Sequence, residues 1–476
     1  MTAIQEAPAA EAVSLDGRTF TYVAEHTVPF RPGDVVVLRA AGAALLGQVT
    51  STAASGSERS ATAHGEGVVL AALGDDGRPV RGDVPPFPVA TVAAAPVEVL
   101  EDLQRSVGAT LPVGVWRGGA AEAVARLRAG GFNRHTFLCG QSGSGKTYAL
   151  GVLLEQLLVA TDLRMVVLDP NADFVRLGET RPDASQEATA RLGDGTVRVL
   201  RAEGTGSEPL RMRFATMPAR AQAAVLRLDP VADRGEYNRF LHMVATVGTV
   251  GNGTVGELAA ALREGDADGR ALGQRIENLG MQDWQVWARD QPSAAEVIAG
   301  HPRATVLDLS GFSDPLEPLA VSLDVLEHLW THRTERVPTL VVIDEAHNLC
   351  AAEPTSAVQE LVTARIIQIA AEGRKYGLWL LLSTQRPSKI HPQVLSQCDN
   401  LALMRMNSRA DLAELATVFG FVPPAMLAAS PHYHQGEMLL AGAFVPAPTL
   451  VRVGPRQTFE GGSDVPVPVR GPAHHG

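Results

Sequence analysis

Lysine is almost missing from this sequence. Lysine and arginine together number 41 in 476 residues, yet lysine occurs only at Lys146, Lys375 and Lys389. Arginine therefore carries nearly all of the positive charge. The first lysine lies in a glycine-rich stretch, GQSGSGKTYAL, and its isolation indicates a position whose chemistry arginine cannot supply.

Cysteines and long apolar runs are also scarce. The three cysteines, Cys139, Cys350 and Cys398, are too far apart in the chain for a zinc cluster or a disulfide framework. No run of about 18 uncharged apolar residues occurs, so the sequence predicts no membrane span. The first residues lack the basic and then apolar order of a secretory signal. We therefore expect a cytoplasmic protein with reduced thiols and no membrane partner.

The chain has fewer basic residues than acidic ones, and its formal net charge is −11. This is the wrong sign for a protein that coats itself in nucleic acid. Local field rather than net charge attracts phosphate, so a ring with a basic lumen and an acidic exterior would have the same total. The composition leaves DNA binding open.

Two patterns divide the chain. Short apolar stretches such as RTFTYVAE and DVVVLRAA alternate with turn residues before about residue 100, and they predict a small β-barrel. The proline-marked segment Pro85–Leu100 is expected to be the exit and linker. From about residue 130, strands alternate with helices, which predicts an α/β class with a parallel sheet covered on both faces.

These patterns give expected domain boundaries. Residues 1–105 form the N-terminal β-barrel domain, and residues 106–184 and 302–453 form two parts of an α/β core. The segment 185–301 is rich in Ala, Arg, Glu and Leu and is predicted to be a largely helical insertion. Residues 454–476 carry Pro and Gly throughout and are expected to be an extended arm.

The glycine-rich stretch fits the phosphate-binding loop pattern G-x-x-x-x-G-K-[ST]. Its glycines let successive backbone N–H groups face phosphate oxygens, and the following helix adds the positive end of its dipole. Lys146 reaches the β- and γ-phosphates as a compact charge that a planar guanidinium cannot replace. Thr147 supplies a hydroxyl for Mg²⁺. The predicted ATP-binding set consists of Gly140, Ser142, Gly143, Ser144, Gly145, Lys146, Thr147 and the adjoining Tyr148.

A buried strand later in the chain ends in two acids, in TLVVIDEAHNL. Asp344 is predicted to hold the Mg²⁺ shell, as a Walker B aspartate does. Glu345 is predicted to act as the general base on the water that attacks the γ-phosphate. The alternative is that the two acids merely begin a helix, where its dipole favours negative charge.

The next strand, LWLLLSTQRP, also ends in polar residues. Thr384 and Gln385 are candidates to sense the γ-phosphate or to position the attacking water, although an ordinary polar strand exit has the same pattern. Before this strand a predicted helix ends in Arg374 and Lys375. These two cations are either C-terminal capping residues, or Arg374 reaches the nucleotide of a neighbouring subunit.

Five segments together resemble the HerA/FtsK branch of P-loop ATPases, and within it the HerA-type hexameric DNA translocases. They are FNRHTFLCGQSGSGKT, VVLDPNADF, LVVIDEAHNL, EGRKYGLWLLLSTQRPSKIHPQVLSQCDN and RQTFEGGSDVPVP. The resemblance implies a RecA-like P-loop ATPase core with a helical insertion behind an N-terminal β-barrel. It also implies a homohexameric ring with ATP and Mg²⁺ between subunits and double-stranded DNA through the centre.

The resemblance extends to individual residues. Arg134 and Arg374 are implied to contact ATP across the subunit boundary, and Arg386 to act as a further sensor. Asp173 is implied to lie near the nucleotide, although relatives usually carry Glu there. Proteins of this type commonly work with a nuclease in DNA end processing, or with an effector enzyme in anti-phage defence.

Other readings of the motifs remain. DEAH at Asp344–His347 is shared with DEAH-box helicases, but their late arginine motif is missing. Conjugative and secretion ATPases have the same fold but normally bring a membrane segment or docking domain. A nucleotide-controlled ring scaffold that positions an effector without moving DNA would use the same site residues as a motor.

Overall fold

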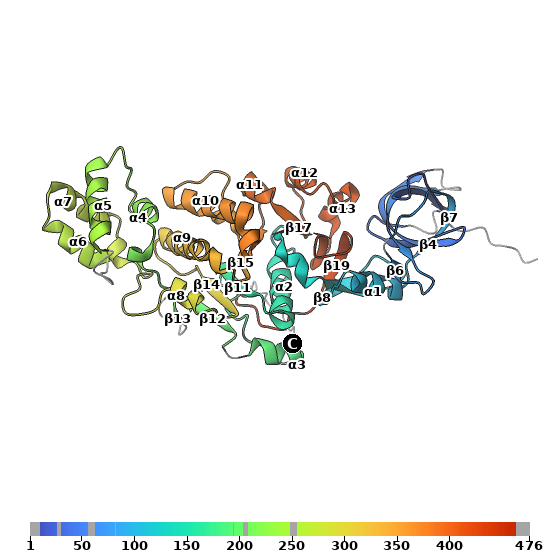
Figure 1. Cartoon of the computed structure of the whole chain (residues 1–476), viewed down its shortest axis with the longest axis horizontal. Helices are drawn as coiled ribbons and strands as arrows, with labels where there is room; N and C mark the ends of the chain where they lie inside the picture. The colour runs from blue at the N-terminus through green and yellow to red at the C-terminus, as the bar shows by residue number, and fades with distance from the viewer. Residues whose placement is uncertain are drawn as a thin grey trace, which may run out of the picture.

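The computed structural model describes residues 10–25, 30–55, 62–80, 82–193, 195–202, 208–247 and 255–462. The predicted arm therefore lies outside the described residues from position 463 onward. Figure 1 shows a β-barrel at one end, a cluster of helices at the other and an α/β core between them. The α/β class with an N-terminal barrel is confirmed.

The barrel is an antiparallel sheet in the order β2-β1-β7-β3-β4-β5-β6, and it closes because β2 also pairs with β5. Its strands are β1 (Ala10–Ser14), β2 (Thr19–Glu25), β3 (Val35–Ala40), β4 (Ala43–Ser55), β5 (Thr62–Leu73), β6 (Pro79–Val80) and β7 (Phe87–Ala94). Alternate residues of β2, among them Phe20 and Tyr22, are buried. Gly67 is required opposite them, because a Cβ there would lie 2.1 Å from the Phe20 ring.

The prediction that Pro85–Leu100 is an exit and linker is wrong. Residues Phe87–Ala94 form β7, which lies between β1 and β3 in the barrel. The helix α1 (Val97–Ser106) then begins directly after Pro96. The prolines suggested an exit from the domain, but Pro88 is tolerated beside a register shift, in a strand whose buried residues Phe87, Ala90 and Val92 fill the barrel.

A second, twelve-stranded sheet forms the core, in the order β13-β12-β14-β11-β15-β16-β10-β17-β18-β19-β8-β9. The strands from β13 to β17 in this order are parallel and the rest are antiparallel. Their bounds are β8 (Leu111–Trp116), β9 (Ala123–Leu127), β10 (His135–Cys139), β11 (Arg164–Asp169), β12 (Val197–Arg201), β13 (Glu208–Pro209), β14 (Ala304–Asp308), β15 (Thr339–Ile343), β16 (Leu378–Thr384), β17 (Cys398–Leu403), β18 (Glu437–Gly442) and β19 (Thr449–Val453).

Helices cover both faces of this sheet. Consecutive strand residues point to opposite faces, so Val341 of β15 packs with the helices α9 and α10, whereas Val342 packs with α2. The remaining helices are α2 (Lys146–Ala160), α3 (Gln186–Leu192), α4 (Ala219–Val225), α5 (Arg234–Val247), α6 (Val255–Arg263), α7 (Ala267–Asn278), α8 (Ala294–Ala299), α9 (Leu316–Thr331), α10 (Ala357–Glu372), α11 (Pro392–Leu395), α12 (Arg409–Val418) and α13 (Pro424–Ala428). Among the described residues, no helix has both the length and the apolar character needed to cross a membrane.

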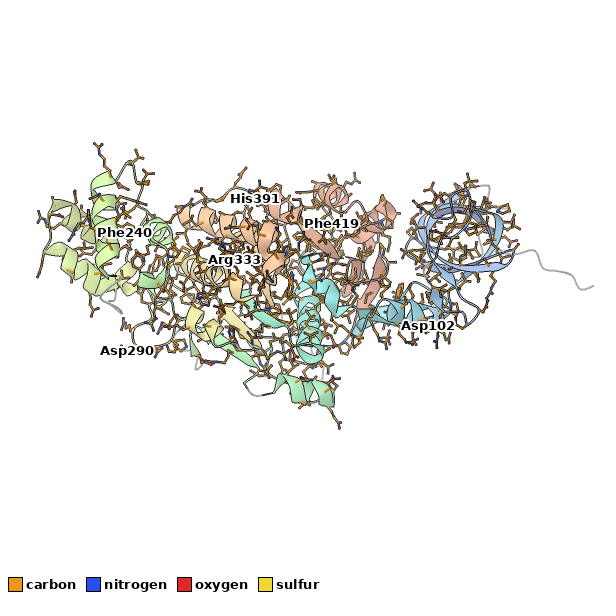
Figure 2. All side chains as sticks on the ribbon, viewed as in Figure 1. Asp102, Phe240, Asp290, Arg333, His391 and Phe419 are labelled. Atoms are coloured by element: carbon orange, nitrogen blue, oxygen red, sulfur yellow. The ribbon has the colours of Figure 1, made fainter. Side chains whose placement is uncertain are left out.

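The segment predicted as a helical insertion, 185–301, is only partly separate from the core. Its strands β12 and β13 extend the parallel sheet beyond β14. From α4 onward the segment is mainly helical, and Figure 2 shows Phe240 among these helices. The sequence did not predict the short strand VRVLR because it contains two arginines. In the structure Arg198 pairs with Glu208 and Arg201 with Asp308.

The buried carboxyl group of Asp324, in α9, is expected to make the stability of the protein depend on pH. It is 5% exposed and its Oδ2 has no hydrogen-bond partner. Burial, with the nearby Glu296 and Glu327, raises the pKa of Asp324 to about 7. Because the folded protein then holds a proton that the unfolded chain releases, the stabilisation present at low pH is lost as pH rises through about 7.

We therefore expect the Asp324→Asn protein to gain stability relative to the wild type as pH increases. The difference in unfolding free energy should grow by about 1.4 kcal/mol per pH unit between the unfolded and folded pKa values. Denaturant unfolding of both proteins at pH 5 and pH 8 measures it. A difference that does not change with pH would mean that Asp324 titrates normally in the folded protein.

Candidate active site

The glycine-rich loop joins β10 to α2, in the predicted order of strand, loop and helix. Gly143 and Gly145 have φ values of +73° and +95°, a region that favours glycine. The N–H of Ser144 donates to the Gln141 carbonyl at 3.1 Å, and the N–H of Gly436 donates to the Ser144 carbonyl at 3.0 Å. These contacts curl the loop over the first turn of α2.

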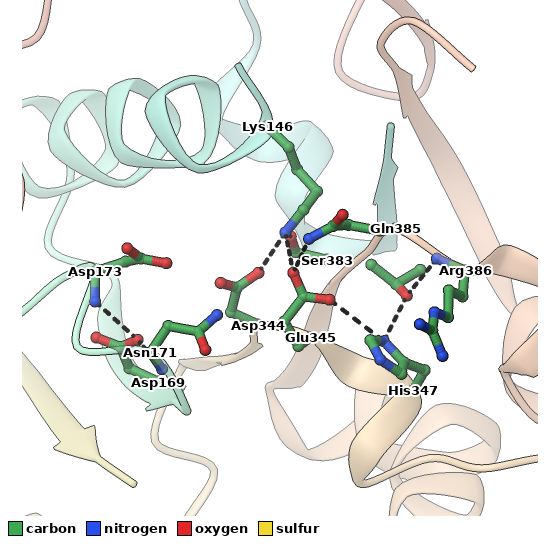
Figure 3. Close-up of polar contacts among 11 residues, drawn as sticks. Lys146, Asp169, Asn171, Asp173, Asp344, Glu345, His347, Ser383, Gln385 and Arg386 are labelled. Carbon is green, nitrogen blue, oxygen red and sulfur yellow. Dashed lines mark hydrogen bonds and ion pairs between the residues drawn. The ribbon is translucent and has the colours of Figure 1, made fainter. Parts of the chain in front are cut away.

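Lys146 is the first residue of α2, and its ammonium group is buried among acids (Figure 3). Its Nζ lies 2.9 Å from Asp344 Oδ1 and 3.1 Å from Glu345 Oε1. It also donates to Ser383 Oγ at 3.0 Å. Burial acts to lower the pKa of Lys146, but the two carboxylates outweigh burial and raise it. The ammonium group is therefore charged at neutral pH.

The two acids follow β15 directly, at the same edge of the sheet as the loop. The strand register pairs Ile343 with Leu382, and Cys139 with Thr384, so all three strands end together. Asp344 is buried and its Oδ2 has no protein partner. Glu345 has a left-handed backbone, with φ of +43°, which is unfavourable for a side chain other than glycine. Glu345 is the N-cap of the 3₁₀ turn Ala346–Asn348, and its carboxylate faces Lys146.

The polar end of β16 reaches the same place. The Gln385 amide donates to Glu345 Oε1 at 2.9 Å. His347 Nδ1 lies 3.3 Å from Glu345 Oε2 and 3.1 Å from Thr384 Oγ1. The backbone N–H of Arg386 also donates to Thr384 Oγ1, at 3.0 Å. Glu345 is thus held by groups from two neighbouring strands.

Two further acids, Asp169 at the end of β11 and Asp173 after it, lie on the other side of Asp344 (Figure 3). Asp169 accepts hydrogen bonds from the backbone N–H groups of Asn171, Asp173 and Phe174. Burial raises the pKa of Asp169 to about 7. Burial, followed by the charge of Asp344, raises the pKa of Asp173 to about 6. Asp173 is thus within electrostatic range of the site, although no hydrogen bond joins it to Lys146.

A cavity of about 470 Å³ opens over the loop. Tyr148 and Gln385 line it on the sheet side, and Gln435, Gly436 and Glu460 line it from the C-terminal part of the chain. This is the space in which a triphosphate would face the loop N–H groups and Lys146. The other lining residues are Gln141, Ser142, Gly143, Gly145, Lys146 and Thr147.

Comparisons with known proteins agree with this geometry. A family model described as "Helicase HerA, central domain" matches residues 119–258. The DNA double-strand break repair helicase HerA of Sulfolobus acidocaldarius is 22% identical over 426 residues, which cover 82% of this chain and 78% of that protein. The HerA helicase of Sulfurisphaera tokodaii is 28% identical over 174 residues, 34% of each chain. The probable helicase MJECL08 of Methanocaldococcus jannaschii is 33% identical over 127 residues, 27% of this chain and 24% of that protein.

The matched regions thus span about a third of the Sulfurisphaera helicase and about a quarter of MJECL08. Among solved structures, VirB4 of Thermoanaerobacter pseudethanolicus has a TM-score of 0.51 at 14% identity, covering 73% of this chain and 97% of that one. This likeness concerns the fold. Residues 119–258 thus match the central domain of HerA helicases, and the fold is that of a P-loop ATPase. Its RecA-like core is the parallel part of the twelve-stranded sheet with α2, α9 and α10.

Two predicted site residues, Arg134 and Arg374, lie away from the loop. Arg134 precedes β10, and Arg374 lies in the 3₁₀ turn Gly373–Tyr376 that precedes β16. Both are therefore at the amino ends of strands whose carboxyl ends carry the loop, Thr384 and Gln385. Each pairs with Asp399 instead, Arg134 Nε at 3.4 Å and Arg374 Nη1 at 2.8 Å.

The residues at the loop fit a magnesium nucleotide. Asp344 Oδ2 and Ser144 Oγ are buried oxygens without protein partners. Thr147 lines the cavity beside Lys146. In the part of the chain that the structure describes, no three His, Cys, Asp or Glu side chains form a metal cage. Mg²⁺ usually takes one or two carboxylates together with water and substrate phosphates, so Asp344 and Thr147 are a sufficient protein contribution.

Several residues of the site were not predicted. Ser383 and His347 contact Lys146 and Glu345, and the motifs that contain them gave no reason to select them. Gln435, Gly436 and Glu460 reach the cavity from nearly 300 residues beyond the loop. No local pattern in the sequence signals them. Gln435 and Gly436 are placed by the pairing of β18 with β17 and β19, and Glu460 by the contact between Arg456 and Glu155.

Proposed function

We propose that this chain is an ATP-hydrolysing, homohexameric translocase on double-stranded DNA, working with a nuclease or another effector. The proposal rests on one observation. A buried ammonium and two carboxylates meet at the carboxyl edge of the sheet, whereas Arg134 and Arg374 lie at the amino edge. Over β10 the two edges are roughly 15 Å apart at about 3.3 Å per residue. These arginines therefore act on a nucleotide held by another protomer.

Each residue at the carboxyl edge has a role in hydrolysis. The N–H groups of Gly143, Gly145, Lys146 and Thr147 bind phosphate oxygens, and the Lys146 ammonium binds the β- and γ-phosphates. Glu345 accepts the proton of the attacking water. Gln385, whose amide contacts Glu345, orients that water.

Thr147 and Asp344 would hold the metal, Asp344 through Oδ2, which has no protein partner. Bound Mg²⁺ would neutralise charge on the β- and γ-phosphate oxygens. Asp173, whose pKa responds to the charge of Asp344, would face the water shell of the metal. Tyr148 lines the cavity at the nucleoside end, and Arg386 senses the γ-phosphate.

The DNA substrate is supported by the names of the relatives, which are DNA double-strand break repair helicases. DNA end processing is accordingly the task that we propose, with anti-phage defence as the alternative setting for the same motor. The effector is a separate protein in either setting.

The test measures assembly and ATP turnover together. The purified protein should form hexamers in light scattering with a non-hydrolysable ATP analogue, and linear duplex DNA should raise its turnover. The Lys146→Ala protein is the control and should lose about 10²–10³-fold in turnover. Turnover that ignores DNA but responds to a copurified protein would favour the ring scaffold. A monomer that binds no ATP, with DNA and that protein present, would refute both functions.

A further inference from the structure

Asp399 lies between the two arginines of the amino edge. It belongs to β17, which pairs with β10, and β10 in turn pairs with β16. Its Oδ2 is 2.8 Å from Arg374 Nη1 and 3.4 Å from Arg134 Nε. One carboxylate oxygen thus contacts cations that come from two different neighbouring segments.

A β-bulge aims Asp399 at this place. His135 pairs with Cys398, but Thr136 pairs with Asn400, so Asp399 is the extra residue of β17. Bulges re-aim a side chain and are found beside functional sites. Without the bulge, Asp399 would point to the same face of the sheet as Leu401 and Leu403, whose side chains are buried in the core.

The bulge is anchored by buried contacts. Asn400 is fully buried, and its amide donates to the Gly131 carbonyl and to Thr136 Oγ1, both at 3.0 Å. Its Oδ1 accepts the Ala443 N–H at 2.8 Å. Gly442 closes the other side, because a Cβ there would lie 2.3 Å from the Asp399 carbonyl. The backbone at Asp399 is therefore fixed by the buried contacts of Asn400 and by the close approach of Gly442.

Stability alone does not account for this arrangement. The side chains of Arg134, Arg374 and Asp399 are 43%, 38% and 46% exposed. Ion pairs so open to water contribute little to folding. What the carboxylate does is restrict two long side chains that would otherwise sample many rotamers. Two guanidinium groups and one carboxylate still leave a net positive charge and free N–H donors for an anion.

We propose that Asp399 is a positioning residue that holds Arg134 and Arg374 side by side for the triphosphate bound by a neighbouring protomer. This inference rests on the proposed function, in which the arginines act between subunits. Asp399 itself does not touch the nucleotide. Removing it should misplace both guanidinium groups, and a misplacement of about 1 Å can cost about 10²-fold in rate.

The first experiment compares Asp399→Ala, Asp399→Glu and wild-type hexamers. Asp399→Ala should lower kcat by about 10²-fold, with KM for ATP and the thermal midpoint changed little. Asp399→Glu should recover part of the rate, because it restores a carboxylate. Wild-type turnover in Asp399→Ala, or a rate loss matched by a lower thermal midpoint, would overturn the proposal.

The second experiment tests whether Asp399 supports the ATP site of a neighbouring subunit or that of its own subunit. Asp399→Ala and Lys146→Ala chains are coexpressed with different affinity tags, and mixed rings are isolated on both tags. Where a Lys146→Ala subunit presents its intact arginines to the loop of an Asp399→Ala subunit, a complete site forms. ATP turnover should then exceed that of either homogeneous ring about tenfold or more.

Mixed rings of Arg374→Ala and Lys146→Ala are the matched control. Recovery in the control without recovery in the Asp399→Ala mixture would reject the positioning role and leave the proposed function standing. Absence of recovery in both mixtures would reject the action of these arginines between subunits, and the positioning role with it.

Discussion

Replacing Glu345 with glutamine is expected to lower ATP turnover by about 10²–10⁴-fold while ATP still binds. The amide has the shape of the carboxylate but cannot accept the proton of the attacking water. Lys146 keeps its contact with Asp344 Oδ1, so the binding cradle should persist. Steady-state turnover and the retention of labelled ATP after rapid gel filtration measure the two effects.

Glu360→Gln is the matched control, because Glu360 is an exposed acid of α10. It should hydrolyse ATP like the wild type. Normal turnover in the Glu345→Gln protein would remove Glu345 as the base. Loss of ATP binding would instead mean that its negative charge is needed to orient Lys146.

The second large effect concerns folding, at the pair formed by Glu155 of α2 and Arg456. Both side chains are fully buried, with Glu155 Oε1 at 2.8 Å from Arg456 Nε. The carboxylate also accepts the N–H groups of Gln457 and Thr458, and the Thr458 hydroxyl. The chain after β19 is thereby attached to the helix that begins at the phosphate-binding loop.

We expect Glu155→Ala to reduce the free energy of unfolding by about 3–5 kcal/mol, because the Arg456 charge would remain buried without a counter-ion. Equilibrium denaturation measures the loss. The double variant Glu155→Leu, Arg456→Met should recover most of it, since no charge is then left in the core. A loss below about 1 kcal/mol, the range of surface pairs, would contradict the burial of this pair.

The parts of the site that follow local rules could be predicted from the sequence. The glycines, Lys146 and Thr147 are consecutive, and their strand and helix lie on either side, so the loop was recognisable without any tertiary information. Asp344 and Glu345 were recognisable because a buried strand that ends in acids places them at the carboxyl edge of a parallel sheet. Their meeting with Lys146 at about 3 Å follows from the strand register.

What could not be predicted depends on pairing between distant segments. Asp399 gained its position from a bulge in the β10–β17 pair, and no sequence pattern marks the extra residue. Glu460 reaches the cavity because Arg456 is held by Glu155, three hundred residues earlier. Prolines misled the prediction at β7, since barrel pairing tolerates them where a local rule predicts a break.

Closure of the N-terminal barrel through β2 and β5 restricts how another protein can engage that domain. Strand addition needs a row of free backbone donors and acceptors along an edge. The closed ring of strands uses those groups internally, and the two residues of β6 include a proline, which has no N–H to offer. A protein that docks there must therefore recognise outward side chains, such as the exposed Val23 and Val89, so its specificity can be altered by substitutions that leave every main-chain bond of the barrel in place.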